Sequence, residues 1–373
     1  MPVMNLRDIL THAAQNRYAV GSFELYGLEF IHGILDAAEQ SRSPVILGVN
    51  AAAPDVPALL AAAICAARRA TVPVALYLHD ATSVETVVRG VRHGCNGISL
   101  DASHLTMAEN INLTRAAVDT GRHCGIPTGG ALSVDPGNDI SAPSDTSQMR
   151  QFVSQTGIDF LTLKRGARAE QQQFAARVEE YRAAQIPLAV DEGCVDAPIL
   201  TTLAEEGVAL IHSAGALSAA AVQRCAAGMS QWQGDYDALS RHVRHAVAGA
   251  AAPRIAAWGG AGRATDALKH CRPHREVEHL IIYNVKTSLG ESEVEDMMAA
   301  GRQVLSPIPG VRRVFTGRAV QDKSGYRYCW LVRFSGEAVI DSYRDHPDHQ
   351  HFADTLFRPV AGDRISIDYE SVE

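Results

Sequence analysis

Residues 18–50, YAVGSFELYGLEFIHGILDAAEQSRSPVILGVN, decide the fold that this sequence predicts. Two short apolar runs, YAVGSFEL (18–25) and PVILGVN (44–50), flank a segment, 28–41, in which apolar residues recur at spacings of three and four. That spacing is typical of a helix, and the near-continuous apolar character of the runs is typical of strands buried in a parallel sheet. The stretch therefore predicts a strand–helix–strand unit.

The same alternation continues to about residue 215. We predict a further helix at 148–155 and further strands at PVALYLHD (73–80), GISLDAS (97–103), IPTGGAL (126–132), FLTLKRG (160–166), PLAVDEG (187–193) and ALIHSAG (209–215). Eight strands with helical crossovers predict the α/β class and a parallel sheet closed into a (β/α)8 TIM barrel. An open, doubly wound sheet is the alternative, although no GxGxxG motif follows the first strand.

The pattern changes after the predicted barrel. Residues 228–275 predict a closing helix and a loop at 259–266. From Val277 the sequence predicts the strands VEHLIIYNV, CWLVRFS and RISIDYESV and the helices SEVEDMMAAGRQVL and EAVIDSYRD. This order suggests a small ferredoxin-like α+β domain. We expect the barrel at 1–265, a linker at 266–276 and the second domain at 277–373.

The composition of the chain limits the binding partners and the cellular compartment that we expect for it. The chain of 373 residues has a formal net charge of −8, which argues against nucleic acid or an anionic membrane as a partner. No apolar run approaches the roughly 20 residues of a membrane span, and residues 1–17 lack the apolar core of a signal peptide. The seven cysteines are scattered and form no CxxC motif, a pattern that indicates reduced thiols and not a disulfide framework. We therefore expect a cytoplasmic protein.

Polar residues at the carboxyl ends of barrel strands are the candidates for function, because barrel enzymes place their chemistry there. Asp101 and Ser213 could instead cap helices, and Arg165 and Glu192 could form a solvated ion pair. The candidates for substrate binding are Glu24, Asn50, Asp101, Arg165, Glu192, His212 and Ser213, and the candidates for catalysis are His79, Asp80, Lys164 and Asp191.

Lys164 follows the apolar run FLTL on the sixth predicted strand. An apolar setting lowers the pKa of an amine and favours its attack on a carbonyl group. Lys164 is therefore a candidate nucleophile. A lysine that extends to solvent, or that pairs with Asp191 on the next strand, is the alternative.

Several segments are similar to class II, zinc-dependent fructose-bisphosphate aldolases and their tagatose-bisphosphate relatives: 5–47, 100–119, 151–163, 182–190 and the closing GGAGRA (259–264). The resemblance covers about residues 1–265. It implies a TIM-barrel aldolase that forms a dimer.

The zinc site of that family does not carry over. Its third-strand motif His-Leu-Asp-His-Gly becomes YLHDA (77–81), so His79 stands at the catalytic acid/base and Asp80 at a zinc ligand. The other two ligand histidines match Ala169 and Asp191. A catalytic zinc needs about three protein ligands with nitrogen or sulfur prominent. We therefore expect no metal, with Mg²⁺ at Asp80 and Asp191 as the alternative.

The substrate contacts of the family differ too. Its fifth-strand carboxylates match Gly129 and Ala131, and its phosphate-binding Asn-x-x-Thr-Asp matches HSAGA (212–216). The resemblance therefore predicts a substrate other than a sugar bisphosphate.

The second domain is similar to the Dabb, or stress-responsive A/B barrel, family of dimeric α+β barrels. The similarity rests on VEHLIIYNVK, IPGVRRVFTGR, YCWLVRFS and SYRDHPDHQHF (342–352). A few polyketide cyclases of that family use residues that match His279, Tyr343 and His349. The resemblance makes His349 a candidate general base, while a structural role for the motif is the alternative.

Three functions remain open. In the first, the barrel is a metal-independent carbon–carbon lyase or aldol-type condensing enzyme on a small carbonyl compound. Lys164 forms an iminium, and His79, with Asp80 or Asp191, moves the proton. In the second, the second domain is a cyclase or isomerase. In the third, the chain is a non-catalytic pseudoaldolase that binds a metabolite. We expect a homodimer in each case.

Overall fold

The computed structural model describes residues 3–134, 146–165, 170–182, 185–228, 236–286, 289–321 and 325–372. The chain divides into two compact units, formed mainly by residues up to His274 and mainly by residues from Arg275 onward. The domain boundaries expected from the sequence remain predictions.

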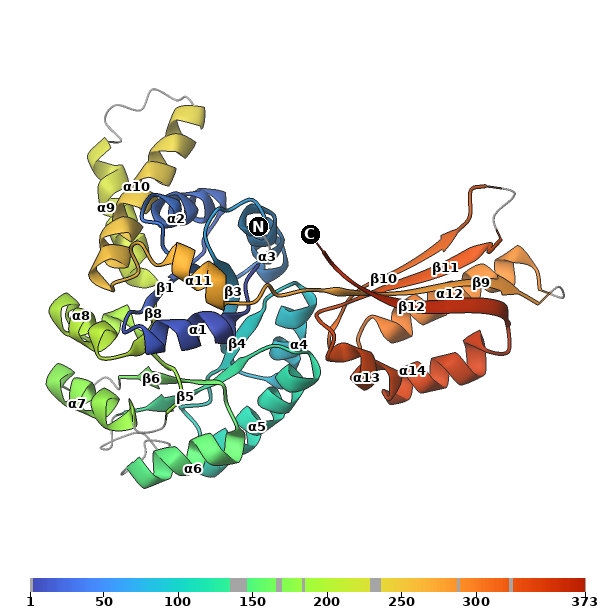
Figure 1. Ribbon diagram of the computed structural model, residues 1–373, viewed down its shortest axis with the longest axis horizontal. Coiled ribbons are helices and arrows are strands. Elements are labelled where there is room, and N and C mark those ends of the chain that lie inside the picture. Colours follow the sequence, from blue (N-terminus) through green and yellow to red (C-terminus); the bar gives the residue numbers. More distant parts are fainter. Residues whose placement is uncertain are drawn as a thin grey trace. The chain divides into compact units, whose positions relative to one another are not determined.

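The first unit is a closed barrel of eight parallel strands in sequential order (Figure 1). Strand β1 pairs with both β2 and β8, which closes the sheet. The (β/α)8 prediction is confirmed, and the open sheet is wrong. The strands are β1 (Val20–Glu24), β2 (Val45–Asn50), β3 (Val74–Ala81), β4 (Gly97–Leu100), β5 (Thr128–Ser133), β6 (Phe160–Lys164), β7 (Leu188–Asp191) and β8 (Val208–Ser213).

Helices surround these strands (Figure 1). A Cβ on Gly33 would lie 2.6 Å from the backbone oxygen of Arg244, so glycine is required where α2 and α10 meet. The stretch predicted as a loop, 259–266, ends early because α11 begins at Ala264. The helices are α1 (Leu6–Gln15), α2 (Leu28–Gln40), α3 (Val56–Ala67), α4 (Val84–Arg92), α5 (Met107–His123), α6 (Thr146–Thr156), α7 (Gln171–Tyr181), α8 (Ala197–Glu205), α9 (Gly215–Gly228), α10 (Tyr236–Ala257) and α11 (Ala264–His270).

The amino-terminal end of the barrel is filled with apolar side chains. Leu6, Ile9 and Leu10 of α1 pack there against the inward residues Tyr77 and Phe160, and all five are buried. This packing restricts solvent and ligands to the opposite end, where the strands carry their polar residues.

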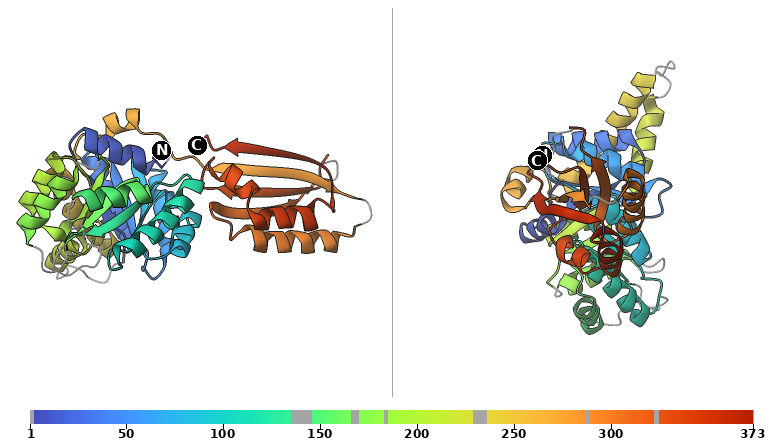
Figure 2. Two further views of the ribbon diagram at one scale, coloured as in Figure 1. Left: turned by 90° about the horizontal axis from the view of Figure 1, so that it is seen from below. Right: turned by 90° about the vertical axis from the view of Figure 1, so that its right-hand side faces the viewer.

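The second unit has a four-stranded antiparallel sheet in the order β10-β11-β9-β12. Its helices lie on one face of the sheet (Figure 2). The predicted ferredoxin-like α+β domain is confirmed, although β10 and α14 were not among the predicted elements. The elements are β9 (Val277–Val285), α12 (Glu291–Leu305), β10 (Val311–Arg318), β11 (Tyr328–Phe334), α13 (Val339–Arg344), α14 (Pro347–Phe352) and β12 (Ala361–Glu370).

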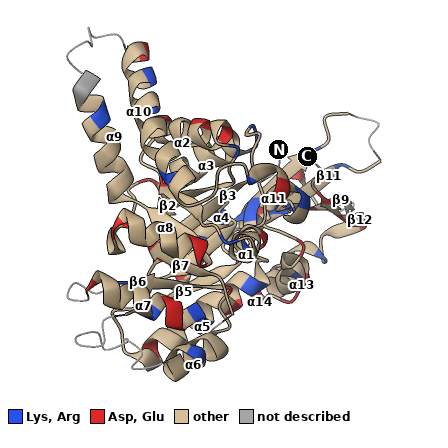
Figure 3. Ribbon diagram, turned by 60° about the vertical axis from the view of Figure 1, so that its left-hand side comes forward, with Lys and Arg blue, Asp and Glu red and all other residues tan. Residues whose placement is uncertain are grey.

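Among the described residues, no helix has the length and apolar character to cross a membrane. Lysine and arginine are interspersed with aspartate and glutamate along the barrel helices (Figure 3).

Candidate active site

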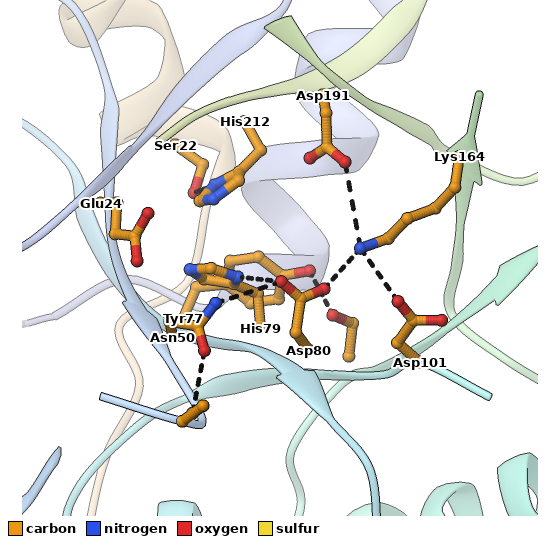
Figure 4. A network of polar contacts seen from close by, with 12 residues as sticks. Ser22, Glu24, Asn50, Tyr77, His79, Asp80, Asp101, Lys164, Asp191 and His212 are labelled. Carbon is orange, nitrogen blue, oxygen red and sulfur yellow. Dashed lines mark hydrogen bonds and ion pairs between the residues drawn. The ribbon is translucent and has the colours of Figure 1, made fainter. Parts of the chain in front are cut away.

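Asp80 has an unusual backbone conformation near the end of β3. Its φ is 58°, in the left-handed region that aspartate tolerates better than most residues. The pairing of β3 with β4 changes register between Leu78 and Ala81. A regular strand directs consecutive side chains to opposite faces, whereas His79 and Asp80 line the same cavity (Figure 4). The irregularity therefore gives one strand end two functional side chains.

This conformation yields a stability prediction. Asp80→Ala and Asp80→Gly remove the same side-chain contacts, but only alanine keeps the Cβ that disfavours a left-handed φ. We expect the glycine variant to be more stable than the alanine variant by about 1 kcal/mol in urea unfolding followed by circular dichroism. In an ordinary strand the glycine variant is the less stable of the two. A more stable alanine variant would therefore contradict the left-handed φ of Asp80.

The Lys164 side chain, at the end of β6, lies among three carboxylates (Figure 4). Its Nζ is 2.6 Å from Asp80 Oδ1, 3.0 Å from Asp101 Oδ2 and 3.9 Å from Asp191 Oδ2. Burial alone would lower the pKa of Lys164, but the charges of the three carboxylates raise it above its ordinary value. The lowered pKa expected from the sequence is therefore wrong, and Lys164 is a cation at neutral pH.

The pKa values of the three carboxyl groups are shifted in different directions. Burial would raise the pKa of Asp80, but His79 and Lys164 hold it well below its usual range. Burial opposes the ionisation of Asp101 in the same way, and Lys164 and the hydrogen bonds from Ser103 again lower the pKa. Burial prevails at Asp191 and raises its pKa despite the Lys164 ammonium. Asp191 is therefore the carboxyl group among the three that most readily holds a proton.

Two buried imidazoles lie side by side at the same end of the barrel. The rings of His79 and His212 have centroids 4.0 Å apart, and the Tyr77 ring lies 5.8 Å from that of His79 and 6.5 Å from that of His212. His79 Nδ1 is 3.0 Å from Asp80 Oδ2, and His212 Nδ1 is 3.0 Å from Ser22 Oγ. Burial lowers the pKa of His212 well below its ordinary value, so this ring is neutral.

Strand β2 leaves room for these rings. A Cβ on Gly48 would lie 3.3 Å from Cε1 of His212 and 3.1 Å from Ser22 Oγ, so glycine permits the close approach of the imidazole. At the end of β2, Asn50 Nδ2 donates a hydrogen bond to Asp80 Oδ2 at 3.3 Å. Asn50 therefore helps to orient the carboxylate that contacts both His79 and Lys164.

Glu192 follows β7 and has a partner that the sequence did not indicate. Its carboxylate accepts a hydrogen bond from Arg254 Nε at 2.7 Å and another from the Ser213 hydroxyl. The expected partner was Arg165, whereas the ion pair that the structure shows for Glu192 is with Arg254 of α10. The Ser213 hydroxyl contacts a carboxylate. Among the described residues, the Ser213 side chain makes no hydrogen bond that caps α9.

These strand ends surround a cavity of about 320 Å³. That volume is within the usual range for a small-molecule site. Four of the seven predicted binding residues do not belong to its lining: Glu24, Asp101, Arg165 and Ser213. The predicted catalytic residue Lys164 is not a lining residue either, and it lies behind the lining residues Asp80 and Asp191, whose carboxylates it contacts. The lining residues are Asn50, His79, Asp80, Asp191, Glu192, Gly193, His212, Ala214, Gly215 and Ala216.

The three candidates of the second domain also lie together. The ring centroids of Tyr343 and His349 are 4.3 Å apart, and those of His279 and Tyr343 are 6.1 Å apart. Burial lowers the pKa of His349, and His349 Nδ1 is 3.0 Å from the Arg344 backbone oxygen. The apolar cavity beside Tyr343 and His349 measures only about 30 Å³, close to the room needed for a water molecule.

The fold and the site define the class of protein. A family model for class II fructose-bisphosphate aldolases matches residues 4–263, and a model for the stress responsive A/B barrel domain matches residues 277–371. The chain belongs to the class II fructose-bisphosphate aldolase family and carries a Dabb domain after the barrel.

Two relatives illustrate the range of similarity. YdjI of Escherichia coli K12 is 30% identical over 274 residues, which is 68% of this chain and 96% of YdjI. The crystal structure of the YdjI aldolase has a TM-score of 0.62 at 28% identity, covering 70% of this chain and 99% of that one. The "Probable fructose-bisphosphate aldolase" of Bacillus subtilis is 32% identical over 173 residues, 43% of this chain and 61% of that protein.

The zinc that the family implies does not fit the matching residues. Ala169, at one ligand position, lies outside the described residues. Asp80 and Asp191, at the other two, both face the Lys164 ammonium. A dication there would have to displace this ammonium, and the same holds for Mg²⁺ at Asp80 and Asp191. A different set, Glu24, His79 and His212, does bring three possible metal donors together.

Proposed function

We propose that this chain is an aldolase-type carbon–carbon lyase, or the corresponding condensing enzyme, that acts on a small unphosphorylated carbonyl compound. It works without zinc at the family's ligand positions. The observation that carries the proposal is the Lys164 ammonium, held 2.6 Å from Asp80 and 3.0 Å from Asp101 at the end of the barrel where the cavity lies.

Cleavage of an aldol needs a base at the hydroxyl group and a positive group at the carbonyl oxygen. The base takes the hydroxyl proton, the carbon–carbon bond breaks, and its electron pair passes to the carbonyl oxygen as an enolate. We assign the stabilisation of that oxygen to the fixed ammonium of Lys164. We assign the proton transfer to Asp191, because it lines the cavity and its raised pKa suits the exchange of a proton. The enolate carbon then takes up a proton to give the second carbonyl product.

Charge supports the choice of an unphosphorylated substrate. The cavity lining includes Asp80, Asp191 and Glu192, and it contains no lysine or arginine among the described residues. The nearby cations Lys164 and Arg254 are already paired with carboxylates. A phosphate dianion would therefore lie beside carboxylates with no cation of the described lining to pair with it, which opposes its binding.

A panel of aldols and aldol donors, with and without phosphate groups, tests this substrate class. We expect carbon–carbon bond cleavage or formation, followed by NMR of the products, with one or more unphosphorylated compounds. We expect kcat/KM for fructose 1,6-bisphosphate to be at least about 100-fold lower than for the best unphosphorylated compound, because each misplaced charge costs several kcal/mol. Efficient cleavage of the bisphosphate would contradict the proposal.

Cyclase chemistry in the second domain is the other candidate, favoured by the clustered rings of His279, Tyr343 and His349. The cavity there is about 30 Å³, far below the volume of a usual ligand pocket. A non-catalytic pseudoaldolase is disfavoured by the strongly shifted pKa values in the barrel, which are typical of functional sites.

We also infer a homodimer formed through the sheet of the second domain. Strand β12 exposes Ile365, Ile367 and Tyr369, with 40%, 41% and 50% of each residue accessible. We expect light scattering after gel filtration to give twice the chain mass of 40.0 kDa. Ile365→Lys with Ile367→Lys should give a monomer, because two buried charges oppose association. A monomeric native protein would contradict this inference.

A further inference from the structure

The two imidazoles at the barrel mouth each leave one ring nitrogen without a partner. Nε2 of His79 and Nε2 of His212 are buried and have no hydrogen-bond partner among the described residues. Only 3% of His79 and 8% of His212 is accessible to solvent. Buried polar atoms without partners are rare, since their desolvation is not compensated. Two such nitrogens side by side indicate a binding site for a ligand.

The opposite nitrogen of each ring is fixed. His79 Nδ1 donates to the Asp80 carboxylate at 3.0 Å, which leaves a lone pair on Nε2. His212 Nδ1 is 3.0 Å from Ser22 Oγ, its neighbour across the β1–β8 junction that closes the barrel. Imidazoles that bind metals are held in this way, with one nitrogen on a carboxylate or another polar group and the other on the ion.

Glu24 supplies a third donor. One donor atom from each of Glu24, His79 and His212 lies within 4.8 Å of the other two. The Glu24 carboxylate faces the His79 ring (Figure 4), and the Tyr26 hydroxyl donates to Glu24 Oε2 at 2.9 Å. Donors at about 2.1 Å from one tetrahedral ion lie about 3.4 Å apart, so metal binding would draw the three side chains together.

We propose that Glu24, His79 and His212 bind one divalent transition-metal ion, with its remaining coordination positions open toward the cavity that His79 and His212 line. Two imidazoles and a carboxylate suit Zn²⁺, Fe²⁺ or Co²⁺ better than Mg²⁺ or Ca²⁺. The set differs from the family's ligand positions, which match Asp80, Ala169 and Asp191 in this chain. A metal ion bound to His79 Nε2 would prevent proton transfer through that nitrogen. The proposed site therefore makes His79 a metal ligand and not a proton carrier.

The inference goes beyond the proposed function and is tested without an activity assay. Untagged full-length protein is freed of metal with a chelator and titrated with Co²⁺, followed by the visible absorption of bound Co²⁺ and by calorimetry. We expect one ion per chain. His212→Asn and Glu24→Gln should each weaken binding by at least about 100-fold, since each removes one of three protein ligands. Circular dichroism confirms that both variants are folded.

A matched control is available at the other end of the barrel. His12, Asp266 and His270 also place donor atoms within 4.8 Å, but both nitrogens of His12 are hydrogen-bonded, to Tyr18 and Asp266. His270→Ala should therefore leave Co²⁺ binding unchanged.

Two outcomes would overturn the metal site. One is the absence of stoichiometric binding at about 1 mM Co²⁺, well above the usual range for protein transition-metal sites. The other is binding that survives His212→Asn and Glu24→Gln. Either outcome leaves the role of Lys164 in turnover to be decided separately, since that role is tested by the kinetics of Lys164 variants and not by metal binding.

Discussion

Lys164→Met is expected to lower kcat/KM by about 10²- to 10³-fold on the carbonyl compound that the native protein turns over. The variant removes the positive charge that stabilises the developing enolate oxygen, and losses of this size follow removal of one such group. Lys164→Arg keeps the charge near Asp80 and Asp101, so it should retain more activity than the methionine variant although its geometry differs. Steady-state kinetics of both variants provide the measurement.

The arginine variant separates two roles of Lys164. An iminium mechanism needs the free amine, which arginine lacks, so arginine and methionine would then be equally inactive. If the chemistry took place in the second domain, both variants would retain native turnover. Equal inactivity or full activity of the two variants would therefore contradict the electrostatic role.

Asp191→Asn is expected to lower kcat by about 10²- to 10⁴-fold, the usual contribution of general acid–base catalysis. Asparagine has nearly the same shape and cannot exchange the proton. Asp101→Asn is the matched control, because Asp101 also faces Lys164, at 3.0 Å, but does not line the cavity. We expect the control to lose at most about 10-fold, through a weaker hold on the lysine.

A comparison of the two asparagine variants is decisive for Asp191. Similar losses would mean that both carboxylates act only by holding Lys164. A larger loss of kcat in Asp101→Asn than in Asp191→Asn would indicate that Asp101 transfers the proton, and it would contradict the role assigned to Asp191.

The barrel could be predicted from the sequence because each strand is a short apolar run and each crossover has helical spacing. All eight strands lie where they were expected, although the run at 97–103 ends as a strand at Leu100. The next residue, Asp101, turns the chain by accepting hydrogen bonds from the backbone and hydroxyl of Ser103. Such local side-chain bonds compete with strand pairing and are hard to anticipate from apolar patterns.

The site could be predicted only as a set of candidates. The rule that strand ends carry the chemistry selected His79, Asp80, Lys164, Asp191 and His212, and all five lie at the barrel mouth. The pKa of Lys164 could not be predicted, because it depends on carboxylates from three other strands that only the closed barrel brings together. The apolar run beside Lys164 suggested the opposite direction.

Two further features required the tertiary structure. Arg254 lies on α10, more than 60 residues after its partner Glu192, and nothing in the local sequence pairs them. His212 meets Ser22 and approaches Glu24 only because β8 pairs with β1. Sequence patterns within one strand contain no information about such contacts between distant strands.

In the proposed mechanism Lys164 acts as a fixed ammonium and forms no covalent bond to the substrate. Borohydride reduction during turnover, followed by intact-protein and peptide mass spectrometry, tests it most directly, since borohydride converts an iminium into a stable amine. We predict an unchanged mass for the peptide that contains Lys164. A stoichiometric increase by the mass of the reduced substrate on Lys164 would contradict the account.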